Sequence, residues 1–132
     1  MSNYRVLVTD NLSPKGIEIL EKTPGIETVV DNTITAEGLR ASLKDFDALI
    51  VRSRTRLTAD LIETTERLKV VGRAGTGLDN IDIEAATKRG IAVMNTPGGN
   101  TVTTAEHALS LLFSLTRNVP QAYASMKAGK WE

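Results

Sequence analysis

The sequence predicts an α/β fold: a flavodoxin-like, doubly wound parallel sheet of five strands in the order 2-1-3-4-5, with a long C-terminal helix. The first observation is that five short apolar runs alternate with segments that begin in helix-capping residues, which demands a mainly parallel sheet. The second is that residues 48–51 are apolar throughout, as expected of a central strand with both faces buried. Five strands at this spacing suit the flavodoxin-like order. The expected strands are residues 5–10, 26–30, 48–51, 70–73 and 91–94.

Four helices are expected between these strands, because a capping residue marks an end of each. Ser13 stands before Pro14, and this pair is typical of an N-cap followed by the first helical position. Thr35 and Thr58 are expected to cap the next two helices, and Gly90 is expected to end the fourth. The last three helices are expected to span residues 36–44, 59–66 and 82–89.

The last third of the chain differs in pattern from the part before it. A run of turn residues at 95–100 follows the fifth strand, and residues 103–106 match a helix capping box. The helix over residues 101–118 is apolar around most of its circumference, so it is expected to be buried on several sides. The sequence therefore divides into domains at residues 1–99 and 100–132, and its end is interpreted as a cut within a longer protein.

The composition excludes several classes of function. Of the 132 residues, 16 are basic and 16 are acidic, so the charge gives no general reason to expect binding to nucleic acid or to a membrane. There is no cysteine, which excludes a disulfide framework, a thiolate metal site and a cysteine nucleophile. The N-terminal residues show no signal-peptide pattern, and a cytoplasmic location is expected.

The candidate binding residues follow the strands, because ligands bind outside the carboxyl ends of the strands in an open α/β sheet. Arg52 and Ser53 follow the third strand, while Arg73 ends the fourth strand within a glycine-rich loop. Arginines therefore gather at one edge of a chain without net charge, which favours a small ligand with a carboxylate, a phosphate or both. Arg54 and Arg56 are interpreted as solvated loop charges.

The glycine-rich loop, residues 72–77, reads G-x-x-G-x-G. The dinucleotide-binding fingerprint reads G-x-G-x-x-G, so the loop is not interpreted as the pyrophosphate loop of NAD. Two interpretations stay open from the residues alone: an anion cradle of backbone N–H groups, or a tight turn without a ligand. His107 is interpreted as a packing or helix-facing histidine in an apolar helix, and no catalytic residue or metal site is predicted.

Three segments together, residues 71–82, 85–91 and 93–97, match a known pattern. They resemble the D-isomer-specific 2-hydroxyacid dehydrogenases. Residues 49–53 and 124–132 are similar, in addition, to the branch of that family that oxidises 3-phosphoglycerate. The resemblance implies a two-domain, NAD-dependent enzyme of serine biosynthesis.

The resemblance also assigns roles along the chain. Residues 1–99 would be the substrate-binding domain, and residues 100–132 would be the interdomain and dimerisation helix at the start of the NAD-binding domain. Thr76 would lie near the nicotinamide of the cofactor. The residues expected to hold the phosphate or carboxylate of the substrate are Arg52, Ser53, Arg73, Ala74 and Gly75.

These 132 residues do not contain the NAD-binding fingerprint of the family. They also contain no residues that match the family's catalytic arginine, glutamate and histidine. The chain alone is therefore expected to be inactive, to bind a 3-phosphoglycerate-like anion weakly at most, and not to bind NAD tightly. Helix 101–118 is expected either to fold back on the sheet or to pack in a homodimer. The alternative function is a freestanding anion-binding or scaffold module without catalysis.

Overall fold

The computed structural model describes residues 4–131. They form two compact units, one ending at Pro97 and the other beginning at Gly98, and each is described by itself. The first unit holds the sheet and the residues singled out for ligand binding. No helix among residues 4–131 is both long enough and apolar enough to cross a membrane.

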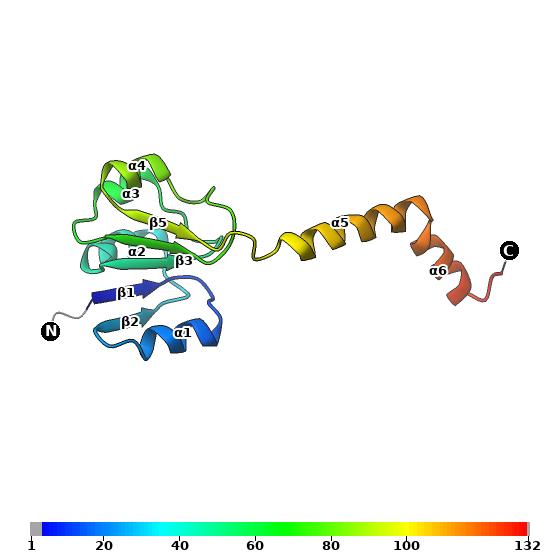
Figure 1. Ribbon diagram of the computed structural model, residues 1–132, viewed down its shortest axis with the longest axis horizontal. Coiled ribbons are helices and arrows are strands. Elements are labelled where there is room, and N and C mark those ends of the chain that lie inside the picture. Colours follow the sequence, from blue (N-terminus) through cyan, green and yellow to red (C-terminus); the bar gives the residue numbers. More distant parts are fainter. Residues whose placement is uncertain (1–3, 132) are drawn as a thin grey trace. The chain divides into compact units, whose positions relative to one another are not determined.

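The first unit is built on a five-stranded parallel sheet in the order β2-β1-β3-β4-β5, which confirms the predicted topology (Figure 1). The central strand is β3, whose residues are the apolar run expected there. The carboxyl ends of all five strands meet at one edge, because every pair is parallel. The strands are β1 (Tyr4–Val8), β2 (Ile26–Val30), β3 (Ala48–Val51), β4 (Val70–Arg73) and β5 (Ala92–Asn95).

Short helices connect the strands, and three of their four caps form side-chain hydrogen bonds. The side chains of Ser13, Thr35 and Asp82 each accept a hydrogen bond from a backbone N–H in the first turn of the helix that follows. The helices of this unit are α1 (Pro14–Glu21), α2 (Ala36–Ser42), the 3-10 turn η1 (Leu43–Asp45), α3 (Ala59–Glu63) and α4 (Ile83–Lys88).

The prediction for α3 was confirmed for the N-cap position, and it was wrong for the capping hydrogen bond and for the length of the helix. Thr58 occupies the N-cap position, but its hydroxyl donates to the Asp60 carboxylate and makes no capping hydrogen bond. The helix also ends at Glu63, and Thr65 and Leu68 beyond it are buried in the loop that leads to β4. Burial of this loop replaces the extra helical turn that the sequence pattern predicted.

The two faces of the sheet are covered unequally. Leu7, Leu49 and Val71 lie on one face, where they pack in a single apolar cluster with side chains of α2, η1, α3 and α4. The register places Val8, Ile50, Gly72 and Met94 in one row on the opposite face. Val8 at one end of the row is fully buried, whereas Met94 at the other end is 56% exposed. The helix α1 lies next to β2, so it covers only part of this second face (Figure 1).

The second unit consists of α5 (Thr101–Thr116) and α6 (Val119–Lys127), which Asn118 separates with a left-handed φ of 50°. The predicted capping box at residues 103–106 was wrong, because the N-cap position of α5 is occupied by Asn100, three residues before Thr103. The expected burial of α5 was also wrong for the single chain: Phe113 is 61% exposed and Leu115 is 77% exposed.

Candidate anion-binding site

Two of the candidate residues, Ser53 and Arg73, meet through a hydrogen bond at the carboxyl edge of the sheet. Nη2 of Arg73, at the end of β4, donates to the hydroxyl of Ser53, just after β3, at 2.9 Å. A hollow of about 430 Å³ lies beside Arg52 and Ser53. It is lined by Asp10, Asn11, Asn32, Arg52, Ser53 and Arg54. Arg73 and Ala74 instead border a second, mainly apolar hollow of about 410 Å³ above Ile50, Gly72 and Met94.

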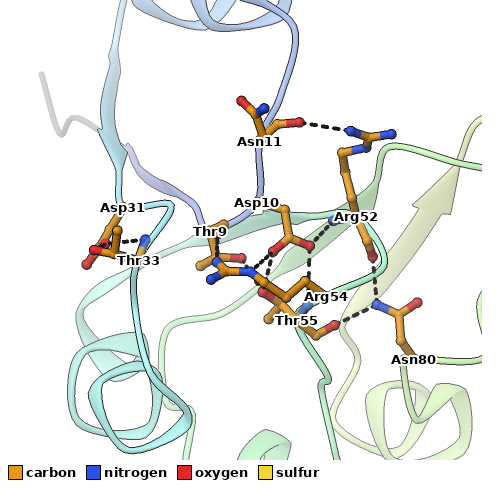
Figure 2. Close-up of polar contacts among 9 residues, drawn as sticks. All are labelled: Thr9, Asp10, Asn11, Asp31, Thr33, Arg52, Arg54, Thr55 and Asn80. Atoms are coloured by element: carbon orange, nitrogen blue, oxygen red, sulfur yellow. Dashed lines mark hydrogen bonds and ion pairs between the residues drawn. The ribbon is translucent and has the colours of Figure 1, made fainter.

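The loop after β3, residues 52–55, is held from two sides, as Figure 2 shows. One carboxylate oxygen of Asp10 accepts hydrogen bonds from the backbone N–H groups of Arg52 at 2.6 Å and Thr55 at 3.3 Å. The side-chain amide of Asn80 donates to the backbone carbonyls of the same two residues, at 2.8 Å to Arg52 and 2.6 Å to Thr55. The loop that carries Ser53 therefore has its two ends fixed by Asp10, which follows β1, and by Asn80, which lies between β4 and α4.

The carboxylate of Asp10 is 4% exposed and is surrounded by donors. Its second oxygen accepts from the Thr55 hydroxyl at 2.8 Å and from Nε of Arg54 at 3.1 Å. Burial by itself raises the pKa of Asp10, but the hydrogen bonds from Thr55, Arg52 and Arg54 together outweigh it and hold the pKa below its ordinary value of 3.8. The group is therefore a carboxylate at neutral pH and acts as an acceptor only.

The interpretation of Arg54 as a solvated loop charge was wrong. Its guanidinium forms an ion pair with Asp10 and also donates to the backbone carbonyl of Thr9. The side chain is 52% exposed, so one side of the guanidinium is fixed and the other faces solvent. The side chain of Arg52 makes no hydrogen bond to Asp10; its Nη1 instead donates to the backbone carbonyl of Asn11 at 3.1 Å (Figure 2).

Arg73 lies directly over Gly75. A Cβ atom built on Gly75 would be 1.7 Å from Nη1 of Arg73 and 2.6 Å from its Cζ, far closer than two atoms can approach. Glycine at position 75 is therefore what allows this conformation of the arginine. Nε of Arg73 is buried and has no hydrogen-bond partner within residues 4–131, so one donor of the guanidinium remains unused.

The glycine-rich loop itself does not fit the pyrophosphate of a dinucleotide. The backbone N–H of Ala74 donates to the carbonyl of Val51 at 2.8 Å, and that of Gly75 donates to the carbonyl of Arg73 at 2.8 Å. These two amides, expected to bind anions, thus bind the chain's own carbonyls. The following helix, α4, begins only at Ile83, so the helix N-terminus that a dinucleotide needs is separated from the glycines.

Two further residues from the sequence analysis lie in different parts of the chain: Thr76 in the glycine-rich loop and His107 in the second unit. The backbone carbonyl of Thr76 accepts from the Asn95 amide at 2.7 Å, which joins the glycine-rich loop to the end of β5. His107 lies in α5 and is exposed, so the interpretation as a packing histidine was wrong for the single chain. Asp82, the first residue of the predicted helix 82–89, is the N-cap of α4.

Sequence reasoning missed the roles of Asp10 and Asn80. One signal was present: an acidic residue follows directly after the buried run of β1, at the edge where ligands bind. Its partners lie 42 to 45 residues away in the sequence, beyond any local pattern.

Comparison with known proteins identifies the family. The family described as "D-isomer specific 2-hydroxyacid dehydrogenase, catalytic domain" matches residues 6–130. The chain belongs to this family. It is 51% identical over 128 residues to the human protein named D-3-phosphoglycerate dehydrogenase, covering 97% of this chain and 24% of the human protein. The expected resemblance to the 2-hydroxyacid dehydrogenases is thereby confirmed.

Solved structures of 2-hydroxyacid dehydrogenase relatives share the fold. A Pyrococcus horikoshii protein matches 98% of this chain and 38% of its own, with a TM-score of 0.84 and 32% identity. The NAD⁺-bound 3-phosphoglycerate dehydrogenase of Entamoeba histolytica matches 86% of this chain and 39% of its own, with a TM-score of 0.71 and 34% identity. The chain spans about a quarter of the length of the curated relatives.

Proposed function

We propose that this chain forms the anion-binding part of the substrate site of an NAD-dependent dehydrogenase that oxidises 3-phosphoglycerate. The observation that carries the proposal is the hydrogen bond from Arg73 to Ser53 at the carboxyl edge of the sheet, where Ser53 also lines the 430 Å³ hollow with Arg52. The relatives named D-3-phosphoglycerate dehydrogenase support the choice of substrate. The cofactor is proposed from the NAD⁺-bound relative.

The residues suit a ligand with a carboxylate at one end and a phosphate at the other. A guanidinium presents N–H donors in a planar fork that matches either group. Arg73 has an unused Nε, and a serine hydroxyl that accepts one hydrogen bond, as Ser53 does, still has a proton to donate. Ala74 and Gly75 contribute by allowing the close approach of Arg73 rather than through their N–H groups.

NAD, when bound, accepts the hydride from the carbon that carries the hydroxyl group of the substrate. The residues at this edge, Arg52, Ser53 and Arg73, bind and orient the anion. We assign neither the hydride transfer nor the acceptance of the hydroxyl proton to any of them, because the one buried carboxylate there, Asp10, is already occupied by donors. Thr76, on the loop after β4, is proposed to lie on the nicotinamide side.

The proposed binding is tested by titrating the ¹⁵N-labelled chain with 3-phosphoglycerate and following the amide signals. We expect the signals of Arg52, Ser53 and Arg73 to move, and Arg73→Gln to weaken binding at least about tenfold through loss of a charged hydrogen-bonding group. Arg56→Gln is the matched control, because it removes the same charge from a residue that borders neither the 430 Å³ hollow nor the 410 Å³ hollow. Equal weakening by both variants, or no movement in the parent chain at millimolar ligand, would overturn the proposal.

We propose in addition that two copies of the chain associate through α5. Six large apolar side chains of this helix are more than half exposed: Val102, Leu109, Leu111, Leu112, Phe113 and Leu115. Apolar surface of that extent on one helix favours burial against a partner. A second copy presents the same surface, so a symmetric pair buries both at once.

A further inference from the structure

We propose that Asp10 and Asn80 are positioning residues, which clamp the loop of residues 52–55 in the form that presents Arg52 and Ser53 to an anionic ligand. The proposal rests on the anion-binding function given above and names residues that act through the loop rather than by touching the ligand. The two residues of the clamp come from different places in the fold. Asp10 follows β1, and Asn80 lies between β4 and α4.

The first half of the clamp holds the N–H groups of the loop. Asp10 accepts from the backbone N–H groups of Arg52 and Thr55 with one oxygen, and from the side chains of Arg54 and Thr55 with the other. All four groups donate a hydrogen bond to the carboxylate. A side chain of the same shape that offered protons would repel part of this set, so the site requires an acceptor on both oxygens.

The second half of the clamp holds the carbonyl groups of the same two loop residues. Nδ2 of Asn80 donates to the carbonyls of Arg52 and Thr55. The orientation of this amide follows from chemistry, because two carbonyl oxygens can only accept. Oδ1 of Asn80 is buried and has no partner within residues 4–131, so the loop's carbonyls alone account for the way the amide points.

The two halves together determine where Ser53 lies. Both backbone polar groups of Arg52 and of Thr55 are fixed, and Ser53 stands between these anchors with its hydroxyl on Arg73. The clamp therefore controls the position of Ser53 directly and that of Arg73 through the Ser53 hydroxyl. This arrangement uses two buried polar residues on one four-residue loop, at the edge of the sheet where the ligand is proposed to bind.

Two substitutions reverse the hydrogen-bonding polarity of the clamp without changing its shape. Asp10→Asn places an NH₂ group among donors, and Asn80→Asp places a carboxylate against two carbonyl oxygens. Asp47→Asn is the matched control. Asp47 is also a buried carboxylate and accepts from the backbone N–H of Arg5 and from Arg67, but it precedes β3 at the opposite edge of the sheet.

The first measurement needs no ligand and uses amide hydrogen exchange in the full chain, under conditions where every variant is folded. We expect faster exchange of the Arg52 amide in Asp10→Asn and altered shifts of Arg52, Ser53 and Thr55 in both clamp variants. Asp47→Asn should leave these signals unchanged. A folded Asp10→Asn chain with unaltered exchange and shifts of the loop would overturn the clamp.

The second measurement is titration of the same chains with 3-phosphoglycerate. We expect the dissociation constant to rise about tenfold in each clamp variant and to change less than twofold in Asp47→Asn. If all three variants bind 3-phosphoglycerate equally weakly, Asp10 and Asn80 contribute only to general stability, and the positioning role is overturned. If the parent chain does not bind, the proposed function fails, and the ligand-free measurement still decides whether the clamp holds the loop.

Discussion

At the scale of single residues, the contact between Gly75 and Arg73 makes a sharp prediction. Gly75→Ala should push the guanidinium of Arg73 away from Ser53, because the new Cβ would be 1.7 Å from Nη1 in the present conformation. We expect affinity for 3-phosphoglycerate to fall about tenfold, with a change in the free energy of unfolding below about 1 kcal/mol, since only a surface loop is altered. Titration and urea denaturation of the variant measure the two quantities.

Gly72→Ala serves as the control for that substitution. A Cβ on Gly72 would lie 3.7 Å from the nearest heavy atom, in the side chain of Ile50, which is an ordinary contact. This variant should keep the affinity of the parent chain. If Gly75→Ala binds as tightly as Gly72→Ala does, Arg73 does not need its present conformation for binding.

The buried carboxylates make a prediction about pH. Hydrogen bonds hold the pKa of Asp10 below 3.8 against the opposing effect of burial, and the backbone N–H of Arg5 with the guanidinium of Arg67 lowers the pKa of Asp47 likewise. The fold thus favours the ionised forms, and their contribution to stability is present above the unfolded pKa and lost as the pH falls through the folded pKa. The free energy of unfolding should drop between about pH 5 and pH 3.

Urea denaturation at a series of pH values checks this expectation. The fall in stability toward acid should be shallower in Asp10→Asn than in the parent chain, because the amide does not titrate. An identical pH dependence of the two chains would show that Asp10 has the same proton affinity in the folded and unfolded states.

At the scale of elements, the sheet and most helix starts were predictable because their causes are local. Apolar β-branched runs form the strands, and Ser13, Thr35 and Asp82 satisfy N–H groups within three residues of themselves.

The errors in the predicted elements arose where tertiary packing determines the structure. The hydroxyl of Thr58 donates to the carboxylate of Asp60 and makes no capping hydrogen bond. Thr65, which was expected in the helix, is buried in the loop after it. The meeting of Ser53 and Arg73 at the carboxyl edge was predictable from the strand ends. The clamp was not, since Asn80 bonds to residues 25 and 28 positions away.

The helix α5 makes a prediction of its own. Its period places Leu109 and Leu112 on the apolar side and Ser110 on the polar side with Thr103 and His107. If α5 joins two copies, Leu109→Lys combined with Leu112→Lys should convert a dimer to a monomer, while Ser110→Lys should not. Sedimentation or light scattering over a range of concentrations measures the mass. A parent chain that stays monomeric at high concentration would contradict the association.

At the scale of the whole molecule, we predict no turnover by this 132-residue chain alone. It contains no G-x-G-x-x-G fingerprint, and its glycine-rich loop bonds to its own carbonyls. The measurement is reduction of NAD in the presence of 3-phosphoglycerate, with a full-length family member as the positive control. Activity that stays with the chain through a second purification would contradict this prediction.

The clamp also has a consequence for how the molecule folds. The contacts of the loop join Asp10 to residues 42 to 45 positions further along the chain, and Asn80 to residues 25 and 28 positions before it. Contacts between such distant residues must overcome the entropy of closing long segments, so they form together with the sheet rather than ahead of it. A refolding chain therefore gains the proposed ligand site only as β1, β3 and β4 come together, and anion binding during refolding should report the moment at which the native sheet appears.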